Sequence, residues 1–85
     1  MTNKLKILKK RLIYRASYRG TKEMDVLLAS FVNKYINDFD ETLLKELENF
    51  LNLEDEIISN YYYHGVKEKR IVENDILKLF KKFKI

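Results

Sequence analysis

The 85 residues suffice for one hydrophobic core, and we expect a single helical domain over residues 1–85. Apolar residues make up 46% and charged residues 35% of the chain, a balance that fits a globular protein better than a disordered one, and the formal net charge is +4. Cysteine is absent, which excludes disulfides and thiol nucleophiles, and no run approaches the roughly 20 apolar residues of a membrane span. These features predict a cytoplasmic protein without stable membrane insertion.

The first two predicted helices meet at Arg19–Gly20. The chain has no proline and only one other glycine, Gly65, so long helices can run unbroken. Apolar residues at spacings of three and four, typical of helices, lie on both sides of the turn. They are Leu5, Leu8, Leu12 and Ala16 before it, and Met24, Leu27, Leu28, Phe31, Val32 and Tyr35 after it.

A third helix is predicted after a turn at Asn37–Asp38. Asp40 is a residue type that caps helix N-termini, and the helix it begins is expected to end at Asn52–Leu53. The apolar positions that this helix should bury are Leu43, Leu44, Leu47, Phe50 and Leu51.

A fourth helix is predicted from about Glu54 to His64–Gly65, and a fifth from about Lys69. Their apolar positions are Ile57, Ile58, Tyr61 and Tyr62 in the fourth helix, and Val72, Ile76, Leu79, Phe80 and Phe83 in the fifth. The sequence therefore predicts an all-α bundle of about five helices with short connections.

Charge is segregated along the chain. Residues 1–22 carry eight Lys or Arg and no acid, residues 23–60 carry ten acids and two bases, and residues 61–85 carry seven bases and three acids. The segments can attract one another within the fold, or the basic segment can form a surface that attracts a partner. The first segment has the charge of a transit peptide without its serine content, and we interpret it as part of the folded protein.

No catalytic or metal-binding motif occurs in the sequence. His64 is the single histidine and precedes a glycine expected to end a helix, so we interpret it as a surface or capping residue. Asp38, Asp40 and Glu41 lack the central glycine of a calcium loop, and there is no glycine-rich phosphate loop. We therefore expect no enzyme, no catalytic residue, and no metal or cofactor of the protein's own.

The segment from Arg15 to Asp25 is the most distinctive. Gly20 supplies a turn, and Glu23 falls in the opening turn of the second helix, where a carboxylate can satisfy free amides. Structure alone can thus explain these residues. The alternative is that Arg19 and Glu23 project from a tight corner into a partner's cleft, with Arg19 binding a carboxylate or phosphate. On that interpretation both side chains should be exposed.

The run from Arg11 to Leu28 resembles the signature of the SdhE family, an Arg-Gly-x-x-Glu motif followed closely by Asp and an apolar helix. The matching positions are Arg19, Gly20, Glu23 and Asp25, with Tyr14 and Arg15 before them and Leu27, Leu28 and Phe31 after them. The resemblance covers roughly residues 11–62. The family's usual tryptophan in the fourth helix is absent, and Tyr61 or Tyr62 stands in its place.

The resemblance implies a five-helix fold and the role of a chaperone, or assembly factor, for the flavoprotein subunit of succinate dehydrogenase or fumarate reductase. Such factors promote covalent attachment of FAD to a histidine of the flavoprotein, so that FAD is the cofactor of the partner. We expect the free protein to be a monomer. The partner-binding residues that the resemblance implies are Arg19, Gly20, Glu23, Asp25, Tyr14 and Arg15.

Two other functions fit parts of the sequence. The basic segments and a pI near 9.3 suit a small nucleic-acid-binding helical protein, although the acidic middle would repel phosphate. The C-terminal segment is expected to carry an apolar stripe on one face of a helix and four lysines on the other. This pattern suits either binding to a membrane surface or a core helix with a basic outer face. The stripe consists of Ile76, Leu79, Phe80 and Phe83.

Overall fold

The computed structural model describes residues 2–84 of the chain. Within this range the protein is all-α and contains no strand, which confirms the predicted fold class. Its five α-helices and one short 3₁₀ helix are α1 (Thr2–Ser17), α2 (Lys22–Tyr35), η1 (Ile36–Asp38), α3 (Glu41–Leu51), α4 (Asp55–His64) and α5 (Asp75–Lys82).

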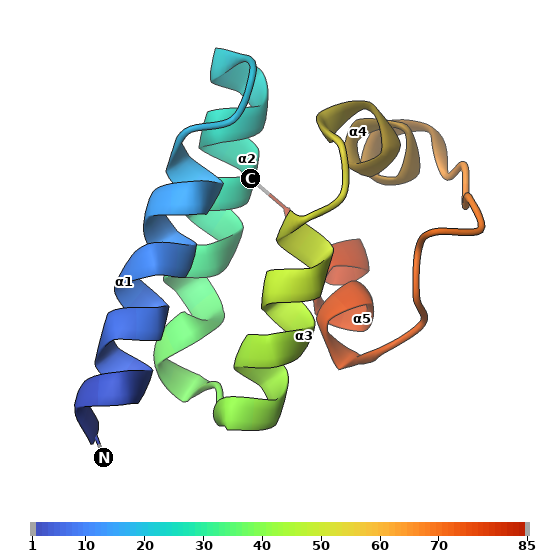
Figure 1. Ribbon diagram of the computed structural model, residues 1–85. Coiled ribbons are helices and arrows are strands. Elements are labelled where there is room, and N and C mark those ends of the chain that lie inside the picture. The colour runs from blue at the N-terminus through green and yellow to red at the C-terminus, as the bar shows by residue number, and fades with distance from the viewer. Residues whose placement is uncertain (1, 85) are drawn as a thin grey trace.

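The first three α-helices lie side by side, and α1 packs against both α2 and α3 (Figure 1). The last two occupy the far side of α3, where α5 packs against it. Short turns join α1 to α2 and α3 to α4 at the same end of the molecule. This topology places the Arg19–Gly20 turn next to the turn at Asn52–Leu53, although they are distant in sequence.

Helix ends follow local side-chain chemistry. The hydroxyl of Thr21 accepts a hydrogen bond from the Met24 amide at 3.2 Å and begins α2, and the Asp40 carboxylate accepts from the Leu43 amide at 2.9 Å and begins α3. Gly65 ends α4 in the left-handed conformation, with a φ of 69°. The predicted cap at Asp40 and the predicted stop at Gly65 are therefore confirmed.

The fifth helix differs from the prediction. It begins at Asp75 rather than near Lys69, because the Asn74 side chain accepts a hydrogen bond from the Leu77 amide at 2.9 Å and caps it there. The residues between Gly65 and Asn74 form a connection longer than expected. Val72, predicted to lie on the buried face of this helix, is exposed in that connection.

Aromatic side chains occupy the centre of the core. Phe31 of α2 is fully buried, and three other rings pack against its ring edge to face. The distances between ring centroids are 5.1 Å to Phe80, 5.5 Å to Phe83 and 6.3 Å to Phe50. Met24, Leu28, Phe31, Leu47 and Phe50 are all buried, as their spacing predicted.

The apolar stripe of the C-terminal segment belongs to this core. Ile76, Phe80 and Phe83 are buried, Leu79 packs against them, and the Tyr62 hydroxyl donates to the carbonyl of Phe83 at 2.7 Å. The stripe therefore covers the protein's own core instead of facing outward toward a membrane surface. Within residues 2–84 there is also no helix long and apolar enough to cross a membrane.

Replacing Phe31 by alanine should lower the free energy of unfolding by about 3–5 kcal/mol, because it removes a ring from the middle of the aromatic cluster. The measurement is urea denaturation followed by circular dichroism. Val26→Ala on the same helix is the control: Val26 is exposed, and its loss should cost no more than about 0.5 kcal/mol. Similar losses for the two variants would contradict this assignment of the core.

Candidate partner-binding site

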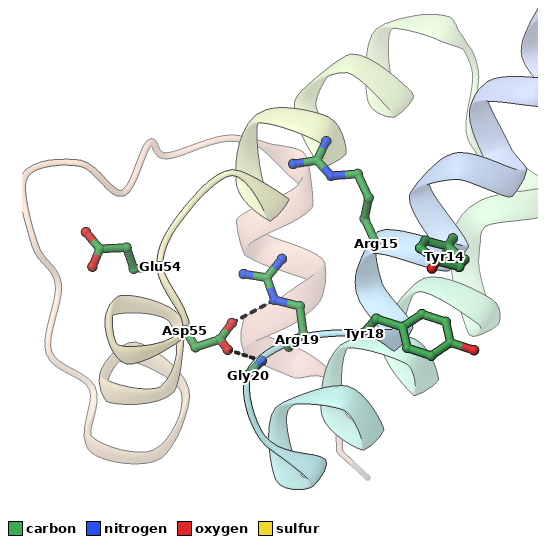
Figure 2. Close-up of a pocket in the computed structure, with 7 residues that line it drawn as sticks. All are labelled: Tyr14, Arg15, Tyr18, Arg19, Gly20, Glu54 and Asp55. Carbon is green, nitrogen blue, oxygen red and sulfur yellow. Dashed lines mark hydrogen bonds and ion pairs between the residues drawn. The ribbon is translucent and has the colours of Figure 1, made fainter.

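The turn between α1 and α2, residues 18–21, is hereafter the corner. Arg19 lies at its centre with a side chain only 10% exposed. Its Nε donates a hydrogen bond to Asp55 Oδ1 at 2.7 Å, and its two terminal nitrogens donate to the carbonyls of Leu51 and Leu53, each at 2.8 Å. Figure 2 shows the Arg19 side chain pointing toward Asp55. One guanidinium thus ties the α1–α2 corner to the α3–α4 turn.

The fit between Arg19 and its acceptors has an electrostatic basis. Leu51 is the last residue of α3, where carbonyls lack helical donors and the helix dipole is negative, so a cation is favoured. Asp55 opens α4, where the dipole is positive and favours a carboxylate. Arginine suits this place because its planar group presents several donors in a rigid fork, whereas lysine presents a single point charge.

Gly20 and Asp25 complete the corner. The Gly20 amide donates to Asp55 Oδ2 at 2.8 Å, and the Arg19 amide donates to Asp25 Oδ1. A β-carbon placed on Gly20 would lie 3.1 Å from Asp55 Oδ2, closer than such contacts normally are. Gly20 is not among the residues with positive φ, so what favours glycine here is the limited space beside Asp55 and not the backbone conformation.

The two side chains expected to project from the corner behave differently. Glu23 is exposed, as predicted. The prediction that Arg19 is exposed is wrong, because its guanidinium is enclosed by acceptors that the sequence places far away. Asp55, the charged partner of Arg19, lies 36 residues further along the chain. Of the six residues in the predicted site, Arg19, Gly20 and Asp25 therefore make hydrogen bonds that fix the corner.

Two exposed aromatic side chains lie at the end of α1 and the start of the corner. Tyr14 and Tyr18 are 64% and 68% exposed, and their ring centroids are 4.5 Å apart (Figure 2). Arg15, between them in sequence, donates to the side-chain oxygen of Asn52 beside α3. All three line a shallow, open depression that ends at Glu54 and Asp55. Two adjacent rings on a surface can pack against a partner at little conformational cost.

Glu23 faces α4 from the start of α2. It lines a second shallow hollow, to which α4 contributes Asp55, Glu56 and Ser59. Within the described part of the chain Glu23 takes part in no ion pair. Partial burial raises the pKa of the Tyr63 hydroxyl on α4, and the nearby Glu23 carboxylate raises that pKa further. The Glu23 carboxylate is thus available to accept hydrogen bonds from a partner.

Sequence reasoning missed Tyr18 and Asp55. Tyr18 could have been found, because it follows Tyr14 by four residues, a spacing that brings two side chains together at the end of a helix. Asp55 gave a weaker signal: it is one of several acids near the start of α4, and nothing local distinguishes it from Glu54 or Glu56.

Within residues 2–84, no cluster of histidine and acidic side chains is arranged to hold a metal ion.

The fold and the corner define a small all-α protein whose distinctive surface is suited to recognition. The sequence profile of the family described as "flavinator of succinate dehydrogenase" matches residues 10–84. The chain therefore belongs to this family of succinate dehydrogenase assembly factors, which confirms the resemblance drawn from the Arg-Gly-x-x-Glu motif.

Several curated relatives carry the name succinate dehydrogenase assembly factor 2, mitochondrial. The relative from Drosophila grimshawi is 39% identical over 77 residues, which cover 86% of this chain and 51% of the relative. The Schizosaccharomyces japonicus relative is 40% identical over 47 residues, which cover 55% of this chain and 33% of the relative. The chain spans about half or less of the length of these relatives. No solved structure matches the chain significantly.

The comparisons correct one prediction and leave another without support. The predicted cytoplasmic location is wrong, because the relatives are named as mitochondrial proteins and point to the mitochondrion. Cysteine content and the lack of an apolar span failed as guides because they do not distinguish one aqueous compartment from another. Nothing in the comparisons supports the nucleic-acid-binding alternative.

Arg19→Gln should lower the free energy of unfolding by about 2 kcal/mol, since it removes the charge and leaves buried acceptors without donors. Arg11→Gln, in α1, is the matched control. Arg11 pairs with Glu48 at 3.5 Å at an exposed site, so its loss should cost at most about 1 kcal/mol. Urea denaturation measures both, and equal losses would show that the enclosed geometry of Arg19 adds nothing.

Proposed function

We propose that this protein binds the flavoprotein subunit of succinate dehydrogenase and promotes covalent attachment of FAD to it. The observation that carries the proposal is the family match over residues 10–84, which includes the whole corner and its motif. The names of the relatives, all succinate dehydrogenase assembly factors, support the same partner. FAD is then the cofactor of the partner, and the chain acts as a chaperone and not as an enzyme.

We further propose that the contact surface is centred on the corner. Tyr14, Tyr18 and Glu23 are its exposed members, and they offer aromatic area and a hydrogen-bond acceptor. Arg15 is half-buried beside them and contributes positive charge at the edge. Arg19, Gly20 and Asp25 contribute by shaping the backbone from which these side chains project.

The mechanism we propose is preorganisation in trans. The covalent bond forms within the flavoprotein, between one of its histidines and the flavin, and the assembly factor supplies orientation. Holding the reacting groups of a partner in a near-attack arrangement lowers the entropic part of the barrier without any catalytic group from the helper. A corner already held by hydrogen bonds is suited to this task, because little freedom is lost when it binds.

Glu23→Ala should leave the fold intact while reducing the fraction of flavoprotein that carries covalent FAD. The loss of one exposed carboxylate in a first helical turn should cost only about 0.5–1 kcal/mol of stability. Flavinylation is measured as flavin fluorescence of the flavoprotein band after denaturing electrophoresis, with circular dichroism as the folding check.

The matched control for this variant is Glu41→Ala, which removes an exposed first-turn carboxylate from α3, outside the proposed surface. It should support flavinylation like the wild type. If folded Glu23→Ala also does so, Glu23 has no part in the function. If both variants fail equally, a general effect of charge removal replaces a specific role for the corner.

A further inference from the structure

We propose that Asp55 is a positioning residue of the partner-binding surface. It lies on α4, outside the motif, and holds Arg19 and Gly20 so that Tyr18 and Glu23 on either side of them keep one fixed arrangement. The proposal rests on the proposed function and deepens it, because it adds a residue distant in sequence to the surface that binds the flavoprotein.

Both oxygens of the Asp55 carboxylate are used in this contact. Oδ1 accepts from Arg19 Nε at 2.7 Å, and Oδ2 accepts from the Gly20 amide at 2.8 Å. An ionised carboxylate is an acceptor at both oxygens, whereas an asparagine amide in the same place would turn an N–H toward one of the two donors. The side chain of Asp55 is 27% exposed, so solvent can replace these bonds only in part.

Asp55 also explains why the motif contains a glycine. The backbone of Gly20 does not adopt positive φ, so its conformation alone does not require glycine. A β-carbon there would approach Asp55 Oδ2 to 3.1 Å, and that oxygen is already bound to the Gly20 amide. A methyl group at Gly20 would therefore require the carboxylate to shift by a few tenths of an ångström, which would disturb both of its hydrogen bonds. The glycine and the aspartate should be energetically coupled.

The same contacts assign an indirect role to Arg19. Its Nε and both terminal nitrogens donate within the protein, and the side chain is 10% exposed. These bonds use three of the five guanidinium N–H groups, and the low exposure leaves a partner carboxylate little access to the other two. Arg19 consequently contributes to recognition through Asp55 and the α3–α4 turn, and the direct contacts come from side chains on either side of it.

The coupling can be measured in the free protein by a double-mutant cycle of Gly20→Ala and Asp55→Ser. Serine is shorter than aspartate and leaves room for the added methyl group. Gly20→Ala should lower the unfolding midpoint and speed exchange of the residue-20 amide when Asp55 is present. In the Asp55→Ser background the same change should have little further effect. Strictly additive effects on both quantities would overturn the proposal.

The functional consequence is tested with the flavoprotein. Asp55→Asn should bind it about ten-fold more weakly, the change expected from losing one charge-assisted contact that orders the surface. A purely positional defect should be relieved by excess factor, so covalent flavin should recover at about ten-fold higher concentration, whereas the Glu23→Ala defect should persist. Asp75→Asn, which changes an exposed aspartate in the first turn of α5, outside the proposed surface, is the control and should match the wild type.

The outcomes separate the two proposals. If wild-type protein raises covalent flavin and folded Asp55→Asn does so equally at limiting concentration, the positioning role is overturned and the proposed function stands. If the wild type neither binds the flavoprotein nor raises covalent flavin, the proposed function fails and the positioning role fails with it. Full recovery by excess Asp55→Asn, together with a non-additive cycle, is the result that supports the proposal.

Discussion

The ion pair between Arg19 and Asp55 joins the two interhelical connections on which the rest of the structure depends. One turn links α1 to α2 and the other links α3 to α4, and the two paired residues are 36 positions apart in the sequence. Burying a charge is costly unless it is paired and hydrogen-bonded. Arg19 meets that condition, because each of its nitrogens donates to a different acceptor at 2.7–2.8 Å.

This arrangement divides the motif into two kinds of residue. One kind makes hydrogen bonds that fix the corner, and it consists of Arg19, Gly20 and Asp25. The other kind is the exposed Glu23. A family motif made of charged residues is easily interpreted as a set of direct contacts with a partner. Here three of its four members act on the backbone instead, so loss of function in a variant of Arg19 or Gly20 would not by itself demonstrate contact.

The helices could be predicted from the sequence, but the contact between Arg19 and Asp55 could not. Helices follow from local sequence signals, whereas this contact joins residues that are far apart in the sequence. Helical periodicity, the Asp40 cap and the Gly65 stop are local signals, and the structure confirms them. The start of α5 was misplaced because an apolar spacing continued through residues that the Asn74 cap excludes from the helix. Asp55 was missed because no local pattern identifies which acid a distant arginine will meet.

The structure is compatible with both interpretations of the segregated charge, namely attraction between segments of the fold and a basic surface that attracts a partner. Two ion pairs join a base of residues 1–22 to an acid of residues 23–60: Arg11 with Glu48, and Arg19 with Asp55. Part of the attraction between the basic and acidic segments therefore acts within the fold. The four lysines of α1 make no such pair among the described residues, and they leave its outer face basic. That field extends over about 10 Å at 0.1 M salt and can speed encounter with an acidic surface, whereas the short-range contacts of the corner determine the orientation that follows. Attraction and orientation therefore depend on different residues, so salt should weaken encounter more than it disturbs the geometry of the bound complex.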